Sequence, residues 1–396
     1  MTNKVPNIRF KGFTDDWEQR KLIDYLEVSK EKNKNEVFGK EDVLSVSGDY
    51  GIVNQIEFQG RSFAGASVAP YGIVDTGDIV YTKSPLKSNP YGIIKANKGK
   101  AGIVSTLYAV YKPLDNVCSD FVQIYFEQDA RMNNYMHPLV NKGAKNDMKV
   151  SDVNALKGEV CFPSKDEQIK ISEHFANLDR LITLHQRKCE QTKELKKFML
   201  QKMFPKKGEK NPEIRFPGFT DDWEQRKVSD VSDRYDNLRV PVAANLRIKG
   251  STPYYGANGI QDYVEGYTHD GEFVLVAEDG ANDLKNYPVN YVNGRVWVNN
   301  HAHVLQAKES IADNRFIGYA ISRANIESVL VGGGRAKLNA EVLMDISLKI
   351  PTKKEQVQIS SFISSLDNLI TLHQRKCEQL KELKKFMLQN MFPKKG

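Results

Sequence analysis

The sequence has few cysteines and no long apolar run. Its 396 residues include only four cysteines, which lie far apart and form no C-x-x-C pair: Cys118, Cys161, Cys189 and Cys377. This argues against a zinc knuckle, a redox motif and a disulfide framework. No apolar stretch approaches the roughly 18 residues that a membrane span needs, and the N-terminus carries no apolar signal segment. We therefore expect a cytoplasmic protein with no membrane partner.

Recognisable catalytic motifs are also missing. A methyltransferase acting on an exocyclic amine would need two adjacent prolines in its active-site corner, and Asn89-Pro90-Tyr91 has only one. Gly99-Lys100-Ala101 is not the phosphate-binding loop of a nucleotide hydrolase, and no group of carboxylates with a lysine resembles a metal-dependent nuclease. We predict that the chain is not an enzyme, has no catalytic residues and needs no cofactor.

One pair of histidines could supply half of a metal site. His301 and His303 alternate along the sequence, as residues on one face of a strand do. The alternative is a pair of strand histidines that form hydrogen bonds, and we favour it. We therefore predict no metal site.

The strongest signal in the sequence is internal repetition. Residues 8–21 recur at 214–227 with one difference, and residues 181–208 recur at 369–396 with two. A period near 200 residues excludes a solenoid of short repeats. Gene duplication with uniform drift is the simplest alternative, but it would not keep the ends nearly identical while the middles diverge. The differing pairs are Lys11 and Pro217, Thr192 and Leu380, and Lys202 and Asn390.

Charge follows the same division of the chain. The two middles are nearly neutral, with 16 basic and 17 acidic residues in 22–164 and 12 and 15 in 228–352. The repeated ends are basic, with 11 against 6 in 165–208 and 9 against 4 in 353–396. Neither middle looks like a generally basic nucleic-acid surface. If a middle binds DNA, it must use local patches and contacts to base edges.

Each repeated end is predicted to form one long helix. Residues 165–203 contain no glycine or proline, and their apolar residues follow a heptad spacing that recurs from residue 363. The seam includes two histidines and two cysteines with no carboxylate beside them, and we interpret these as core polar residues that fix the register rather than as metal ligands. They are His185, His373, Cys189 and Cys377.

Two rods of matching sequence would most simply pack antiparallel, with one globular domain at each end. The middles contain short runs of Val, Ile, Tyr and Thr between turn residues, which predict strands, and helical pieces at 120–136 and 313–330. The predicted fold class is α/β (α+β), with two mixed α/β domains joined by two long antiparallel coiled-coil helices in a pseudo-two-fold arrangement. The predicted divisions are residues 1–164, 165–208, 209–352 and 353–396.

Polar and aromatic loops in the middles suit contacts with DNA. Lysine and arginine suit guanine, asparagine suits adenine, and glycine lets the backbone approach a phosphate. A solvated turn would look similar, so each loop alone is weak evidence. The candidates in the first middle are Lys83, Ser84, Lys87, Asn89, Tyr91, Lys145, Asn146 and Lys149. Those in the second are Tyr254, Tyr255, Asn258, Asp279, Asn282, Lys285, Asn300, His301, His303, Arg335, Lys337 and Asn339.

Several motifs resemble those of a known family. The opening I-R-F-x-G-F-T-D-D-W-E-x-x-K and the Pro-x-x-x-Glu-Gln that begins each helix, at 163–168 and 351–356, resemble the specificity subunit of type I restriction-modification systems. Residues 278–281 and 299–304 resemble segments of that family's target-recognition domains. The first middle lacks these two segments, so contacts inferred for the second cannot be transferred to it.

The resemblance implies a function and partners. It implies two target-recognition domains that each read one half of a bipartite double-stranded DNA site, with the two helices acting as a ruler. It also implies assembly with two modification subunits, which are methyltransferases, and with restriction subunits, which translocate and cut DNA. The alternatives are a coiled-coil scaffold that joins two protein-binding domains, or a self-contained restriction enzyme.

Overall fold

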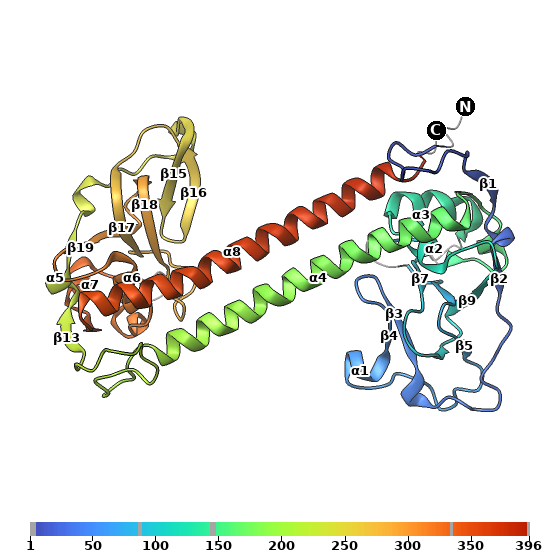
Figure 1. Cartoon of the computed structure of the whole chain (residues 1–396), viewed down its shortest axis with the longest axis horizontal. Helices are drawn as coiled ribbons and strands as arrows, with labels where there is room; N and C mark the ends of the chain where they lie inside the picture. Colours follow the sequence, from blue (N-terminus) through green and yellow to red (C-terminus); the bar gives the residue numbers. More distant parts are fainter. Residues whose placement is uncertain (1–4, 86–88, 143–147, 333–335, 394–396) are drawn as a thin grey trace. The chain divides into compact units, whose positions relative to one another are not determined.

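The chain forms two compact units, and each takes part of both long helices. The computed structural model describes residues 5–85, 89–142, 148–332 and 336–393 (Figure 1). Unit 1 consists of Met1–His185 with Lys376–Gly396, and unit 2 consists of Gln186–Arg375. In the part of the chain that is described, no helix is both long enough and apolar enough to cross a membrane. The division of the sequence at residues 164, 208 and 352 remains a prediction.

Two helices of equal length carry the repeated ends. Helix α4 spans Lys165–Lys202 and α8 spans Lys353–Asn390, with 38 residues each. Both match the segments predicted from the absence of glycine and proline, which confirms the prediction of two long helices. The predicted heptad seam is buried at Ile171, Phe175, Leu178, Ile182 and Cys189 of α4 and at Ile363, Leu366 and Cys377 of α8.

Within each unit, the two helices run antiparallel. In unit 1 the Phe175 ring lies 6.3 Å from the Phe392 ring, and Asp179 pairs with Lys384 at 2.8 Å. Residue numbers therefore rise along α4 in the direction in which they fall along the C-terminal segment. Unit 2 has the matching ion pair between Lys196 and Asp367, at 2.5 Å. The same register is therefore used in both units.

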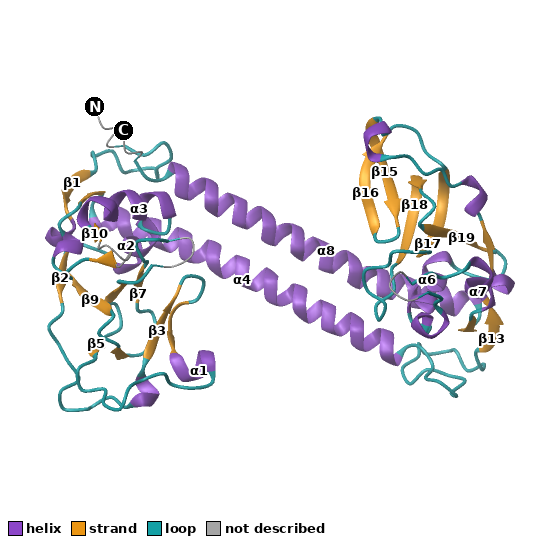
Figure 2. Cartoon of the chain, turned by 180° about the vertical axis from the view of Figure 1, so that it is seen from behind, coloured by secondary structure: helices purple, strands orange, loops and turns teal. Residues whose placement is uncertain are grey.

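Unit 1 is built from short strands and small helices (Figure 2). Strands β2, β9, β6 and β7 form a four-stranded antiparallel sheet in that order, and β1–β12, β3–β4, β5–β8 and β10–β11 are two-stranded pairs. The strands are β1 Glu18–Lys21, β2 Leu26–Val28, β3 Leu44–Ser47, β4 Gly51–Asn54, β5 Gly72–Val74, β6 Ile79–Thr82, β7 Ile94–Ala96, β8 Gly102–Val104, β9 Tyr108–Pro113, β10 Asn141–Lys142, β11 Met148–Lys149 and β12 Glu159–Phe162. The short helices are α1 Gln55–Gln59, α2 Ser119–Tyr125 and α3 Asp129–Met136.

Unit 2 contains a larger sheet. Six strands lie in the order β14-β19-β17-β18-β15-β16, antiparallel except for β15 and β18, and α6 packs against β17 and β18. Helix α6 begins where the Asp313 side chain accepts a hydrogen bond from the Phe316 N–H. The strands are β13 Glu224–Lys227, β14 Ser232–Arg234, β15 Lys249–Gly256, β16 Gly259–Val264, β17 His269–Ala277, β18 Val289–Val298, β19 Ala302–Ala307 and β20 Ser347–Ile350. The short helices are α5 Val228–Val231, α6 Asn314–Ser322 and α7 Ala340–Asp345.

The two repeated motifs contact each other in both units. In unit 1, Arg9 forms a two-pronged ion pair with Glu167 at the start of α4, with both N–O distances at 2.7 Å. In unit 2, Arg215 and Glu355 form the same pair at 2.7 and 2.8 Å. The glutamates are almost fully buried, so each arginine compensates a charge that has little access to water.

The glutamine that follows each glutamate also ties the helix to its unit. Gln168 accepts a hydrogen bond from the Cys118 N–H and donates one to the Pro163 carbonyl. Gln356 accepts from the Asp313 N–H and donates to the Pro351 carbonyl. The Pro-x-x-x-Glu-Gln motif therefore has a structural role in both units.

The segment after each long helix completes the core of the unit in which that helix ends. Phe392 packs edge-on against Trp17 in unit 1, at 6.0 Å between ring centres. Phe204 stands 5.8 Å from Trp223 in unit 2 and stacks on Phe316 at 5.4 Å. Neither unit has a complete core without a helix that begins in the other half of the sequence.

Candidate nucleic-acid interface

Loops that are distant in the sequence converge at one edge of unit 2. The Asn258 side chain donates to the Gly280 carbonyl and accepts from the Asn282 N–H, which joins the turn after β15 to the loop after β17. The Leu338 N–H donates to the Glu278 carbonyl at 2.7 Å. Asp279 contacts His301 and forms a bridge with residue 337. Four segments singled out in the sequence therefore form a single surface.

A buried charged network lies beneath this surface. His303, which is 1% exposed, places Nδ1 2.7 Å from an Asp236 carboxylate oxygen and Nε2 2.9 Å from the Leu338 carbonyl. Both partners are oxygen atoms that accept hydrogen bonds, so the ring is held between Asp236 and the Leu338 carbonyl. Glu278 pairs with Arg239 at 2.7 Å on the other side. The network joins β19 to the segment that precedes α7.

The network also controls the acidity of its carboxylates. Burial alone would raise the pKa of Asp236, but the hydrogen bond from His303 and the Val304 N–H outweigh it, and the pKa is lowered. Burial likewise acts to raise the pKa of Glu278, whereas its hydrogen bonds with Arg239 and Lys337 lower it. Both carboxylates are therefore charged at neutral pH and hold the loops through ion pairs.

The same residues include a possible set of metal ligands. Ligand atoms of Asp236, Glu278 and His303 lie within 4.8 Å of one another. Each carboxylate is already paired with a protein cation, since Asp236 lies 3.6 Å from Arg239 and Glu278 binds Arg239 and Lys337. A metal ion would have to displace these cations, so the donor set fits a structural network better than a metal site. Of the two histidines, His303 belongs to this network, whereas His301 precedes β19 and contacts Asp279.

The candidate residues of unit 2 divide into exposed and structural ones. Tyr254 is 1% exposed and lies under the Arg247 guanidinium at 4.0 Å, so it supports the sheet rather than the surface. His303 is buried in the network, and Tyr255, Asp279 and His301 are half-buried. Arg335 lies outside the described residues. The exposed candidates are Asn258, Asn282, Lys285, Asn300, Lys337 and Asn339.

Among the residues that the structure describes, the candidates of unit 1 do not form a comparable surface. Asn89 is buried and donates to Asp129 at 2.5 Å, and Tyr91 is buried beside it. Lys83 is paired with Asp152 at 2.9 Å, and Ser84 is exposed. Lys87, Lys145 and Asn146 lie outside the described residues, and the backbone of Lys149 pairs with Asn141 in the β10–β11 ribbon.

Sequence reasoning missed an aromatic surface in unit 1. Tyr50, at the tip of the β3–β4 hairpin, is 69% exposed and lies 5.1 Å from the Phe58 ring of α1. Phe63 is 55% exposed and has the Arg61 guanidinium 4.6 Å above its ring. The available signal was the Gly-Asp-Tyr-Gly turn at 48–51, which places an aromatic residue at a hairpin tip.

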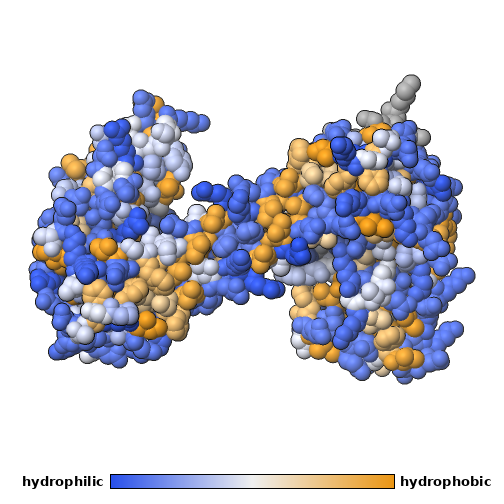
Figure 3. All heavy atoms as spheres, viewed as in Figure 1, coloured by the Kyte–Doolittle hydropathy of each residue, from blue (hydrophilic) through white to orange (hydrophobic). Residues whose placement is uncertain are grey.

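A second candidate surface lies on the long helices (Figure 3). At 100° per residue, four apolar positions of α4 occupy a sector centred about 120° from the buried seam. All four are exposed, and so are the four equivalent positions of α8. They are Leu181, Leu184, Leu195 and Phe198 on α4, and Leu369, Leu372, Leu383 and Phe386 on α8, with exposed fractions between 38% and 51%.

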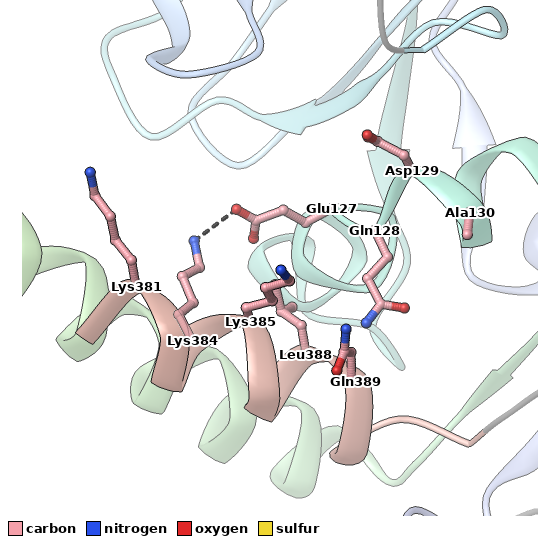
Figure 4. A pocket seen from close by; sticks show the side chains of 9 residues that line it. All are labelled: Glu127, Gln128, Asp129, Ala130, Lys381, Lys384, Lys385, Leu388 and Gln389. Carbon is pink, nitrogen blue, oxygen red and sulfur yellow. Dashed lines mark hydrogen bonds and ion pairs between the residues drawn. The ribbon is translucent and has the colours of Figure 1, made fainter. Parts of the chain in front are cut away.

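A cavity of about 610 Å³ in unit 1 lies between α8 and the loop before α3 (Figure 4). Lys384 points to Glu127 at 2.7 Å and also contacts Asp179, so its charge is compensated inside the unit. Burial acts to lower the pKa of Lys384, but the two carboxylates outweigh it and raise the pKa. The lysine therefore fastens α8 to unit 1 and is not a free amine for catalysis.

Comparisons with known proteins confirm the resemblance seen in the sequence. Residues 220–382 match the model of the type I restriction modification DNA specificity domain. A putative type I restriction enzyme specificity subunit of Haemophilus influenzae is 44% identical over 146 residues, which cover 37% of this chain and 38% of that protein. A putative type I specificity subunit of Methanocaldococcus jannaschii is 22% identical over 94% of this chain and 91% of its own.

A solved structure shows the same fold. The S subunit of a type I restriction-modification system from M. genitalium superposes with a TM-score of 0.66 at 12% identity, over 99% of this chain and 100% of its own. Two mixed α/β units with long helices are thus the architecture of a known S subunit. The comparisons together identify the chain as similar to type I specificity subunits, and unit 2 carries most of the matched specificity domain.

Proposed function

We propose that the chain is the DNA specificity subunit of a type I restriction-modification complex, and that each unit reads one half of a bipartite site on double-stranded DNA. The observation that carries this proposal is the convergence of the loops around Asn258, Asn282, Asn300 and Lys337 within the matched specificity domain. Amide and ammonium groups on one exposed edge suit base edges in a groove. The chain itself is proposed to be non-catalytic and to select the site on which its partners act.

The units are proposed to read independently, because their middles differ while their frames match. Replacing residues 22–164 with the corresponding segment of a relative should change one half-site and leave the other intact. Mapping of methylated adenines in cells that carry the complex measures both half-sites at once. A change in both half-sites would contradict independent reading.

The loop surface can be tested at single residues. We expect Asn300→Ala and Lys337→Ala to weaken binding to the specific duplex, with an asparagine–adenine contact contributing about 1–3 kcal/mol of discrimination. Arg226→Ala is the matched control, because Arg226 lies in the same unit and forms an exposed ion pair with Glu224. Specific protection of a duplex by the complex separates a specificity subunit from a coiled-coil scaffold. Methyl transfer or cleavage by the purified chain alone would favour a self-contained enzyme.

The repeated helices are proposed to dock two modification subunits, which in turn would recruit the restriction subunits. The exposed apolar positions of α4 recur on α8, and identical surfaces suit identical partners. Leu181→Gln with Leu184→Gln should reduce the number of bound modification subunits from two to one. Leu369→Gln with Leu372→Gln should also reduce the number of bound modification subunits to one. Gln191→Ala is the control and should leave two bound. Two bound copies in the four-fold variant would contradict the proposal.

The helices are also proposed to set the spacer between the half-sites. Four residues inserted near Lys193 and again near Lys381 lengthen each helix by about 6 Å. Since one base pair adds about 3.4 Å along a strand, we expect the unread spacer to grow by one base pair, or at most two. Both half-site sequences should persist in methylation mapping. An unchanged spacer in an active complex would mean that the helices are not the ruler.

A further inference from the structure

A basic pocket lies in unit 2 where α4 ends. It has a volume of about 400 Å³ and is bounded by the Phe204-Pro205-Lys206-Lys207 segment, by α6 and by β20. Four of its lining residues are cations, namely Lys206, Lys207, Arg323 and Lys349, and none of the residues that line it is acidic. The loop surface proposed to read DNA does not include any of these residues.

Three of the four cations, Lys207, Arg323 and Lys349, have no ion pair within the described residues; only Lys206 has one. Arg323 lies over the Phe204 ring at 5.5 Å and makes no ion pair or side-chain hydrogen bond there. The residue as a whole is exposed, and burial of part of its side chain lowers the pKa of the guanidinium. Lys349 on β20 is half-buried and also makes no ion pair. Lys206 is partly neutralised by Glu213 at 3.4 Å and lies at the rim.

Unit 1 contains the same cation–ring contact but uses it differently. Arg131 lies 4.7 Å above Phe392, the residue equivalent to Phe204 in the repeated tail. The Arg131 guanidinium also donates to the Tyr125 carbonyl at 2.9 Å and lies over the Tyr125 ring. Arg131 therefore uses one of its donors within the unit, whereas no side-chain hydrogen bond of Arg323 is found among the described residues.

The residue type at the position of Lys349 also differs between the two units. Gln225 pairs with Lys349 in the β13–β20 ladder, and the equivalent Gln19 pairs with Cys161 in the β1–β12 ladder. Unit 1 thus carries a neutral residue where unit 2 carries a cation, on an otherwise repeated frame. Among the described residues, the cation at position 349 is therefore specific to unit 2.

We propose that this pocket binds a phosphate group, with Arg323 and Lys349 as its main contacts and Lys206 and Lys207 at its rim. A planar guanidinium beside an ammonium matches the oxygens of a phosphate, and partial desolvation of Arg323 strengthens such a contact. The phosphate comes either from a nucleic-acid backbone or from a free nucleotide. The inference does not depend on the proposed function, because a nucleic-acid backbone and a free nucleotide present the same phosphate chemistry to the pocket.

Calorimetric titration of the full chain with pyrophosphate at low ionic strength tests the pocket. We expect saturable binding at one site, weakened about tenfold or more by Arg323→Gln or Lys349→Cys, since a charge-assisted contact contributes about 1.5–3 kcal/mol. Lys349→Cys introduces the residue that unit 1 has at this position, so the fold should tolerate it. Lys197→Gln, an exposed change of the same charge on α4, is the control and should bind as the wild type does.

Competition identifies the source of the phosphate. Displacement of pyrophosphate by a short duplex of arbitrary sequence, lost in Arg323→Gln, indicates a nucleic-acid backbone. Displacement by a nucleoside triphosphate but not by the duplex indicates a free nucleotide. Absence of saturable pyrophosphate binding, or equal binding by the Arg323→Gln/Lys349→Cys double variant, would overturn the proposal.

Discussion

Unit 1 and unit 2 share one frame and differ in what they build on it. The frame includes the ion pair of Arg9 with Glu167 or of Arg215 with Glu355, and an aromatic residue from the end of a long helix. On this frame unit 1 carries a four-stranded sheet of short strands, whereas unit 2 carries six strands with up to 10 residues each. Near-identity in the repeats therefore has a structural cause, because buried partners cannot change one at a time.

The repeated tails carry two separate constraints. Their seam is buried, and packing within each unit explains why it is retained. Their exposed apolar stripe makes no such contribution, and nevertheless Leu181, Leu184 and their counterparts Leu369 and Leu372 match. Packing accounts for the first set, and the proposed docking of identical partners accounts for the second.

The largest expected difference between the units concerns the aromatic residue that completes each core. Phe392 contacts four aromatic rings and Phe204 contacts two, so we expect Phe392→Ala to cost about 4–5 kcal/mol in unit 1 and Phe204→Ala about 3–4 kcal/mol in unit 2. Denaturant unfolding followed by tryptophan fluorescence separates the units in variants that keep either Trp17 alone or Trp223 and Trp297 alone, because Trp17 lies in unit 1 and the other two lie in unit 2.

The control for this comparison is Phe198→Ala, since Phe198 is 46% exposed and should cost less than about 0.5 kcal/mol. If either aromatic variant destabilised both units equally, the units would unfold as one body and the comparison between them would fail.

The ion pair of the frame should be equally important in both units. Arg9→Ala and Arg215→Ala each leave a buried glutamate uncompensated, and we expect each to cost about 3–4 kcal/mol of its own unit's unfolding free energy. Replacing both partners, as in Arg9→Met with Glu167→Leu, should recover most of the loss.

Arg226→Ala serves as the control for this prediction. Its exposed pair with Glu224 should contribute less than about 1 kcal/mol. A small effect at Arg9 with a large one at Arg215 would show that the frame is not equivalent in the two units. Urea unfolding with the same fluorescence probes measures both.

The long helices were predictable from the sequence, whereas the ion pairs of the frame and much of the loop chemistry were not. A heptad pattern without glycine or proline strongly favours a long helix, so α4 was predicted to within one residue and α8 was predicted as a second long helix with the same seam. The pairing of the opening arginine with the helix glutamate was not predicted, because it joins residues 158 positions apart. Only the folded chain brings such groups together.

Candidate residues failed where polar side chains serve the fold. Asn89 and Tyr254 lie in loop-like or turn-rich sequence, yet one is bonded to Asp129 and the other lies beneath Arg247. Polar groups that satisfy buried partners have the same sequence appearance as polar groups that face a ligand. The exposed members, such as Asn300 and Lys337, could be chosen only with burial in view.

The charged network belongs to unit 2 and should make that unit more sensitive to acid. Folding lowers the pKa of Asp236 and Glu278, so their contribution is complete above their unfolded values of about 4 and is lost as pH falls through the folded values. His303→Gln should cost about 2–3 kcal/mol at pH 7 and flatten this loss below about pH 4.

A second histidine provides the internal control for the acid experiment. Burial lowers the pKa of His269, so its contribution is present above about pH 6.5 and falls as the unfolded state takes up a proton below that value. This part of the pH dependence should persist in His303→Gln. Fluorescence of Trp223 in urea between pH 3 and 7 follows both. If His303→Gln lost stability below about pH 4 as steeply as the wild type does, the role given to the network would be contradicted.

The smallest expected effect tests whether the two tails are interchangeable. Leu380 packs against the core of unit 1, whereas at the equivalent position of unit 2 the Thr192 hydroxyl donates to the Lys188 carbonyl of its own helix. Leucine favours a helix more than threonine does and adds apolar contact, so Thr192→Leu should stabilise unit 2 by about 0.5–1 kcal/mol. Leu380→Thr should cost unit 1 a similar amount, and a variant with both changes should move the two transitions in opposite directions. Because nearly every neighbour along the helix is the same in the two tails, a loss of stability in Thr192→Leu would mean that the divergent middle of unit 2, rather than the shared frame, selects the residue at this position.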